Sequence, residues 1–314
     1  MSQFSKDVIE GLSSMPKELS SKYFYDELGD SLFQAIMHLD EYYLTKSEFE
    51  IFSSNKARLT ELFSSNCDTF NLIEFGAGDG LKTKVLLKHM VETGVDFTYI
   101  PIDISQNAIN KLEASLKDEI PMLKVDGVVN EYFGALEEIS KKNQSKNVIL
   151  FLGSNIGNFN DDLAHDFLSQ INKSLKGNDL LLIGFDLKKN PKKILAAYND
   201  KQGITKAFNL NLLSRINKEF EGDFDLGKFD HYPMYNPING ECRSFIISLA
   251  KQQVTLKKLN KSFDFALDEP IFMEISRKYD LQHINNLALK TQFRVKENIF
   301  DCKHFFVDSI WEIK

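Results

Sequence analysis

Three glycines at alternate positions follow an apolar run, and this spacing suits a backbone that binds a ligand. The run at residues 70–75 leads into Gly76, Gly78 and Gly80, and helical spacing begins near Leu81. Glycines let the backbone turn sharply and approach a ligand closely, while the first turn of a helix offers unpaired N–H groups to a carboxylate or phosphate. A tight turn that binds no ligand is the alternative interpretation of this pattern.

Acidic and aromatic residues follow the next two apolar runs. Asp103 ends the run at 97–102, and Glu131 and Tyr132 come after the run at 123–129. A carboxylate in the position of Asp103 can accept hydrogen bonds from both hydroxyls of a ribose. The glycine spacing is GxGxG and not the GxGxxG of dinucleotide sites, so the order favours S-adenosylmethionine. A nicotinamide dinucleotide is the alternative ligand, although nothing in the chain clearly supplies a second phosphate-binding loop.

The elements that carry these residues alternate between short apolar runs and longer amphipathic runs. This alternation is typical of βα units that form a doubly wound parallel sheet, in which ligands bind at the carboxyl ends of the strands. The pattern predicts strands at 70–75, 97–102, 123–129, 146–151 and 179–185. Helical spacing predicts the intervening helices at 81–93, 105–118, 131–142 and 161–176.

The flanking regions have a different pattern. Residues 1–66 are predicted to be helical, with an apolar stripe between Phe24 and Leu39, and a further helix is predicted at 203–220. Residues 223–241, rich in aromatic residues, Asp, Gly and Pro, are predicted to form a loop. Alternating apolar residues predict additional strands at 243–250 and 304–313.

Composition excludes several classes of protein. The 314 residues carry 38 Lys and Arg against 45 Asp and Glu, a net charge of −7 that disfavours a nucleic-acid partner. Three cysteines without a CxxC motif and six histidines without a paired motif argue against disulfides and metal sites. No apolar run is long enough to predict a membrane span or a secretory signal. We therefore expect a cytoplasmic protein without metal, membrane or nucleic acid, whose oligomeric state the sequence leaves open.

Over nearly its whole length the chain resembles the histidine-specific Nα-methyltransferases of ergothioneine biosynthesis. The likeness lies in long motifs such as LIEFGAGDGLKTKVLL, YIPIDIS, FLGSNIGNF and FMEISRKY, and in segments at 23–51 and 197–220. The resemblance implies a Rossmann-like doubly wound methyltransferase sheet and a second α+β substrate-binding domain. We expect the methyltransferase domain at 46–188 plus 279–314, and the substrate domain at 1–45 plus 189–278.

The resemblance also implies roles for particular residues. Those implied at the cofactor are Gly76, Lys82, Asp103, Glu131, Tyr132 and Gly153. Those implied at the amino-acid substrate are Tyr25, Tyr42, Asn158, Tyr198, Glu274 and Ser276, of which Tyr42 and Asn158 are the candidate catalytic groups at the amine. The chain departs from the family pattern at Asp79 and Gly80. The implied reaction is S-adenosylmethionine-dependent methylation of the α-amine of L-histidine, three times, to hercynine.

The chemistry of these residue types is consistent with that reaction. Methyl transfer from a sulfonium is an in-line displacement that needs alignment and exclusion of water more than a strong base. Neutral partners such as Asn158 and Tyr42 suit the amine, because a carboxylate beside it would keep it protonated. Glu274 and Ser276 share one face if their segment is extended, which Pro270 favours, and together they can pair with both nitrogens of an imidazole.

Other interpretations stay open at this point. Asn158 is also explained as a turn residue or a helix N-cap, Glu274 as an exposed glutamate at a helix start, and Tyr43 is an alternative to Tyr42. The same chemistry on another amino acid, such as a tryptophan derivative, is the alternative function. A non-catalytic protein that binds S-adenosylmethionine is the alternative from a different class.

Overall fold

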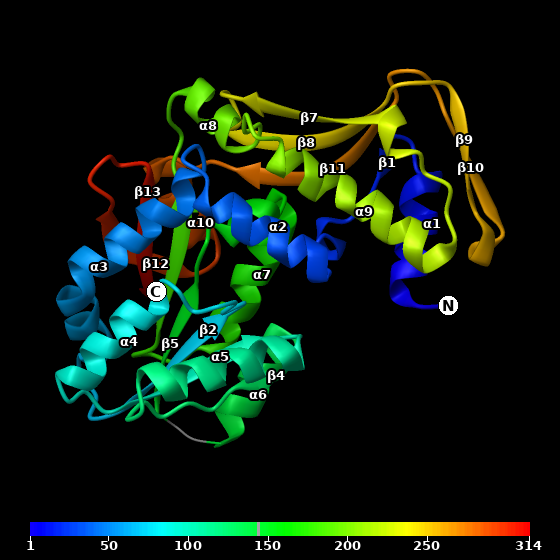
Figure 1. Cartoon of the computed structure of the whole chain (residues 1–314). Helices are drawn as coiled ribbons and strands as arrows, with labels where there is room; N and C mark the ends of the chain where they lie inside the picture. Colours follow the sequence, from blue (N-terminus) through cyan, green and yellow to red (C-terminus); the bar gives the residue numbers. More distant parts are fainter. Residues whose placement is uncertain (143–144) are drawn as a thin grey trace. The chain divides into compact units, whose positions relative to one another are not determined.

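The computed structural model describes residues 1–142 and 145–314, which divide into two compact units (Figure 1). The larger unit consists of Leu44–Lys188 and Lys278–Lys314, and the smaller unit of Met1–Tyr43 and Lys189–Arg277. Within the described ranges, no helix combines the length and apolar character needed to cross a bilayer. The assignment of cofactor binding to one unit and substrate binding to the other stays a prediction.

A seven-stranded sheet forms the centre of the larger unit as described. Its order is β12-β13-β6-β5-β2-β3-β4, in which β4, β3, β2, β5 and β6 run parallel and the pair β13 and β12 is antiparallel. This confirms the predicted doubly wound sheet. The strands are β2 (Phe70–Phe75), β3 (Phe97–Asp103), β4 (Val128–Val129), β5 (Lys146–Phe151), β6 (Leu180–Asp186), β12 (Phe293–Phe300) and β13 (Phe306–Ile313).

Helices cover both faces of this sheet. On one face the core includes apolar residues of α6, α7 and α10, packed on strand residues such as Ile73 and Ile183. The larger unit's helices are α3 (Tyr43–Ser64, which starts in the smaller unit), α4 (Thr83–Glu92), α5 (Gln106–Glu119), α6 (Tyr132–Lys142), α7 (Asp161–Ser174) and α10 (Leu281–Lys290). The third strand is shorter than the predicted 123–129, because Asp126 and Gly127 interrupt the apolar run and only an isolated bridge at Val125 precedes β4.

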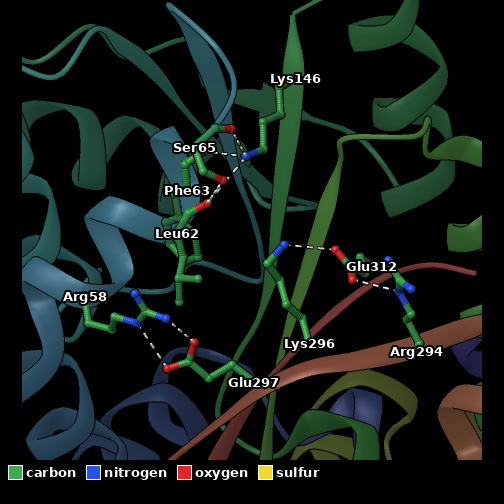
Figure 2. Close-up of polar contacts among 9 residues, drawn as sticks. All are labelled: Arg58, Leu62, Phe63, Ser65, Lys146, Arg294, Lys296, Glu297 and Glu312. Atoms are coloured by element: carbon green, nitrogen blue, oxygen red, sulfur yellow. Dashed lines mark hydrogen bonds and ion pairs between the residues drawn. The ribbon is translucent and has the colours of Figure 1, made fainter.

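Polar contacts fix the C-terminal half of α3 to the sheet (Figure 2). Lys146, at the start of β5, donates to the main-chain oxygens of Phe63 at 2.8 Å and Ser65 at 3.0 Å. Carbonyls at the end of a helix lack helical partners and carry partial negative charge, so an ammonium satisfies them. Arg58, farther back on the helix, forms an ion pair with Glu297 of β12 at 2.8 Å.

The smaller unit packs helices on a four-stranded sheet of order β1-β11-β8-β7. The strands are β1 (Lys17–Glu18), β7 (Phe229–Asn236), β8 (Glu241–Ser248) and β11 (Pro270–Arg277), and β9 (Gln252–Leu256) pairs with β10 (Lys261–Phe265). The helices are α1 (Gln3–Ser13), α2 (Glu27–His38), α8 (Pro191–Ala197) and α9 (Ile204–Phe220). A core of apolar residues from α1, α2, α9 and the strands holds this unit together.

Two predictions for the flanks are wrong. The predicted loop at 223–241 contains β7, in which Phe229, His231 and Pro233 are buried while Tyr232 and Met234 are exposed. This alternation defines a half-buried strand, and its proline is tolerated because β7 lies at the sheet edge. The helical prediction for residues 1–66 fails at β1, which pairs in parallel with β11.

Candidate functional site

The glycine loop after β2 has backbone angles that residues other than glycine rarely adopt. Gly76, Gly78 and Gly80 have φ values of +65°, +56° and +67°. A Cβ added to Gly76 would lie 3.2 Å from the Tyr132 hydroxyl, so the loop passes close to that side chain. Helix α4 starts at Thr83, two residues later than predicted, and its N-cap residue makes no side-chain capping bond. Of the first N–H groups of α4, that of Lys84 donates to the Gly80 carbonyl at 2.8 Å and that of Val85 to the Lys82 carbonyl at 3.3 Å.

Tyr132 and Asp103 meet near the carboxyl ends of β2 and β3. The Tyr132 ring stacks on Phe75 with centroids 4.5 Å apart and planes 4° from parallel. Burial raises the pKa of the Tyr132 hydroxyl, and the nearby Asp103 carboxylate raises it further. Asp103 accepts a hydrogen bond from the Ser105 amide at 2.9 Å, while Glu131 is exposed. The structure therefore brings Gly76, Asp103 and Tyr132 together, and their contacts with a cofactor stay predictions.

Lys82 and Gly153 both contact Glu48, a residue that the sequence did not single out. Glu48 of α3 is 1% exposed and forms an ion pair with the Lys82 ammonium. Both oxygens of Glu48 also accept from the Gly153 amide, at 2.9 and 3.0 Å. No spacing motif relates Glu48 to these partners, because the three residues come from separate segments of the chain.

Glu274 and Ser276 lie on one face of β11, as the extended interpretation predicts. Glu274 is opposite Ser244 of β8, and Ser276 is opposite Cys242, so all four share that face. A register shift between Phe272 and Glu274 precedes them. The explanation of Glu274 as a helix-start residue is therefore wrong. Ser276 is buried and accepts a 2.8 Å hydrogen bond from the hydroxyl of Tyr198, which follows α8.

An aromatic cluster positions Tyr25 and Tyr42 in the same unit. Tyr25 makes edge contacts with Phe33 and Phe208, at 5.6 and 5.7 Å between ring centroids, and Phe33 also contacts Tyr42 at 6.4 Å. Although 46% of the Tyr25 side chain is exposed, desolvation of its hydroxyl raises the pKa. The charge of Glu274 raises it further, which places Glu274 near this cluster.

Tyr43, the alternative to Tyr42, makes different contacts. Its ring is 5% exposed, with the Lys189 ammonium 4.2 Å from the centroid. The Lys189 ammonium also donates to the Tyr43 hydroxyl at 2.9 Å. Tyr43 therefore contacts a lysine, and the role of Tyr42 at the substrate stays a prediction.

Asn158 ends a short 3-10 helix, Asn155–Asn158, in the larger unit. Its side chain is exposed, and the N-cap of α7 is Asn160, which accepts from the Leu163 amide. Asn158 is therefore part of a 3-10 helix, and its explanation as the N-cap of the next helix is wrong. Its contact with a substrate amine stays a prediction.

Two further polar side chains share the face of Glu274 and Ser276. Tyr235 of β7 is opposite Cys242, and His231 is opposite Ile246, two residues beyond Ser244. The sequence did not single out either residue, because the segment was predicted to be a loop. The alternation of buried and exposed positions in FDHYPMYN places them on this face, and it is seen only in the structure.

His231 is expected to make the protein sensitive to acid. Burial lowers the pKa of its imidazole from 6.5 to about 4, despite the carboxylates of Asp230 and Asp200. Between these two pH values the unfolded chain binds the proton more readily than the folded protein does. The free energy of unfolding is therefore highest above pH 6.5 and falls as the pH is lowered toward 4, by at most about 1.4 kcal/mol per pH unit. Urea unfolding at about pH 6.5 and at about pH 4 measures this loss of stability, and the loss should be smaller in His231→Phe. An equal loss in the variant would contradict the prediction.

Comparison with known proteins is consistent with this arrangement. Residues 4–313 match the family described as histidine-specific methyltransferase, SAM-dependent. The chain is 33% identical over 282 residues to histidine N-alpha-methyltransferase of Mycolicibacterium smegmatis, covering 89% of this chain and 85% of that protein. It is 30% identical to ergothioneine biosynthesis protein 1 of Schizosaccharomyces pombe (88% of this chain, 36% of that protein).

A more distant relative acts on a different amine. The chain is 25% identical to 4-dimethylallyltryptophan N-methyltransferase easF of Aspergillus fumigatus, covering 89% of this chain and 84% of that protein. The family match spans nearly the whole chain, and the mycobacterial relative is similar over most of both sequences. The predicted resemblance is confirmed. This chain belongs to the histidine-specific, S-adenosylmethionine-dependent methyltransferases.

Proposed function

We propose that this enzyme methylates the α-amino nitrogen of L-histidine three times and releases hercynine. Family membership supports the reaction class and the amino acid. The observation that carries the choice of histidine is the pairing of Glu274 and Ser276 on one face of β11, with the Tyr198 hydroxyl bonded to Ser276. The number of methyl groups is the one that the resemblance to the ergothioneine-biosynthesis enzymes implies.

The residues around the glycine loop fit S-adenosylmethionine. The cofactor supplies an electrophilic methyl group on a sulfonium. In the proposal, Asp103 binds the ribose hydroxyls, Tyr132 and Glu131 line the adenosine, and Lys82 and the Gly76 and Gly153 backbones bind the methionine end. The positive φ of Gly76 and its closeness to Tyr132 support this, because a side chain there would fill the space beside that ring. Histidine, cysteine and acidic side chains of the described ranges form no group of three suited to a metal.

The imidazole of histidine has one nitrogen that donates and one that accepts. A carboxylate such as Glu274 accepts from the N–H, and the hydroxyl of Ser276 donates to the other nitrogen or accepts from it. The hydroxyl of Tyr198, which donates to Ser276 at 2.8 Å, helps to orient the Ser276 hydroxyl in this proposal. These contacts hold the substrate by its ring and not by its amine.

Repeated methylation requires that the amine is not held by a charged group. An ammonium must lose a proton before its lone pair can attack, and a carboxylate beside it would oppose that loss. In the proposal, Tyr42 and Asn158 are neutral partners of the amine, and the proton of the ammonium is lost to solvent water. Replacement of each N–H by a methyl group then costs one weak hydrogen bond and not an ion pair.

Mass spectrometry of a reaction with S-adenosylmethionine tests the proposal. We expect L-histidine to give products carrying one, two and finally three added methyl groups, and Nα,Nα-dimethylhistidine to give the same final product. L-Tryptophan and L-tyrosine serve as controls for specificity, and tryptophan is included because of the easF relative.

Each alternative predicts a different product pattern. Accumulation of mono- or dimethylhistidine would contradict trimethylation, and faster methylation of tryptophan would contradict the substrate. Binding of S-adenosylmethionine without turnover on any amino acid would identify a non-catalytic binding protein and overturn the proposed function.

A further inference from the structure

A cluster of buried charged groups lies beside the loops that are proposed to bind the methionine end of the cofactor. Glu48 sits with its carboxylate between Lys82 and the Gly153 amide. Because both of its oxygens accept from an N–H and one also binds the ammonium, Glu48 acts as a carboxylate in this cluster. The same carboxylate therefore links α3 to the loop after β2 and to the loop after β5.

The sheet is shaped around this carboxylate. A Cβ added to Gly184 of β6 would be 2.3 Å from Glu48 Oε1, so a side chain there would displace the Glu48 carboxylate. Asp308 of β13 is directly opposite Gly184, is 0% exposed, and neither of its carboxyl oxygens has a hydrogen-bond partner among the described residues. Burial raises the pKa of Asp308, and the nearby charge of Glu48 raises it further.

Three acidic groups face Lys82 from three elements: Glu48 on α3, Glu74 on β2 and Asp308 on β13. Burial opposes the charge on Lys82, but the carboxylates offset that cost and the pKa of Lys82 is raised. Burial raises the pKa of Glu74 to about 7, although the Tyr99 hydroxyl donates to it at 2.6 Å. Of the three, Glu48 is the one that forms an ion pair with the Lys82 ammonium, and it is therefore the direct counter-ion of Lys82.

We propose that Glu48 is a positioning residue for the methyl donor: it orients the Lys82 ammonium and the Gly153 loop to bind the methionine half of S-adenosylmethionine. This inference rests on the proposed cofactor roles of Lys82 and Gly153. An ammonium has three N–H donors and Glu48 accepts one of them, so Lys82 retains donors for the carboxylate of a bound methionine moiety. Glu48 itself does not touch the reacting atoms and acts through Lys82 and Gly153.

The test is binding of S-adenosylhomocysteine to the full-length protein by calorimetry, at neutral pH and at about pH 9. Glu48→Gln is nearly the same size but uncharged, and we expect it to weaken binding by at least about tenfold. The loss should grow with pH, because a buried Lys82 without its counter-ion gives up its proton more easily. The charge of Glu48 contributes to the raised pKa of Glu74, so variants that keep this charge are the reference for the dependence on pH.

Glu297→Gln is the matched control, because it makes the same chemical change and breaks an ion pair between the same helix α3 and the sheet (Figure 2). It should bind S-adenosylhomocysteine like the wild type. Glu48→Asp keeps the charge but is one methylene shorter, so it should weaken binding without the added dependence on pH. If Glu48→Gln does not fold, the comparison of Glu48→Asp with the wild type decides the matter.

Kinetics provide a second measure, in which Glu48→Gln should raise the KM for S-adenosylmethionine much more than the KM for the amino acid. Glu48→Gln binding as tightly as Glu297→Gln, or Glu48→Asp binding like the wild type, would overturn the proposal. A loss in Glu48→Gln that is equal at both pH values would show a merely structural role and would also overturn it. The binding assay contains no histidine, so it stands even if histidine is not the substrate.

Discussion

Glu274→Ala is expected to weaken the binding of L-histidine by roughly ten- to a hundredfold, the value of about 1.5–3 kcal/mol for a hydrogen bond to a charged group. The imidazole N–H loses its acceptor, while the neighbouring hydroxyl of Ser276 and its bond from Tyr198 remain. Affinity for an aromatic amino acid without a ring N–H in that position should change much less. Calorimetry with each amino acid, at saturating S-adenosylhomocysteine, measures both affinities.

Two controls separate recognition of the ring from damage to the strand. Glu274→Gln retains the size and an acceptor oxygen, so it should lose less affinity than Glu274→Ala. Binding of S-adenosylhomocysteine should be the same in all three proteins. If Glu274→Ala binds histidine like the wild type, Glu274 is not the residue that anchors the imidazole.

Lys278→Met is expected to cause the largest loss of stability in the larger unit. Lys278 and Asp186 form an ion pair at 2.9 Å in which both side chains are 0% exposed. The main chain joins the same segments, since the Tyr279 amide donates to the Asp186 carbonyl at 2.8 Å. Removal of one partner from a buried pair leaves an uncompensated charge and costs about 3–5 kcal/mol. The free energy of unfolding should fall by that amount.

Urea unfolding followed by tryptophan fluorescence measures this loss, because the single tryptophan, Trp311, is buried in the larger unit. Lys141→Met makes the same substitution in an exposed ion pair with Glu137 and should have little effect. The double variant Lys278→Met/Asp186→Asn should be more stable than Lys278→Met alone, since it removes the buried charge. Equal stability of the two Lys→Met variants would refute the argument.

The parallel sheet was predictable because its strands are buried on both faces. Such strands are nearly continuous apolar runs, as in Phe70–Phe75, all of whose residues are buried. β7 was missed because Asp230 and Pro233 suggest a loop, whereas the period of two in burial decides the structure. The two residues of β1 are too few to show a hydrophobic pattern in the sequence. They form a strand because they pair with β11.

Some features of the candidate site were predictable from the sequence, and others were not. The positive φ values of the glycine loop and the shared face of Glu274 and Ser276 follow from local rules, so the sequence was sufficient for them. Glu48 was not predictable, because its importance comes from Lys82, Gly153 and Asp308, which separate elements bring to it. Roles at the cofactor and at the amine depend on ligands and stay predictions.

The pairing of β1 with β11 has a consequence for how the chain folds. Lys17 lies in register with Ile271, so closure of this contact encloses most of the chain in one loop. The entropic cost of closure grows only slowly with loop length, but contacts so distant in sequence form late. During synthesis the first strand must therefore wait until residues beyond 270 have been made. We expect the smaller unit to gain protection from proteolysis only near the end of translation, after the parallel strands of the larger unit have been synthesised.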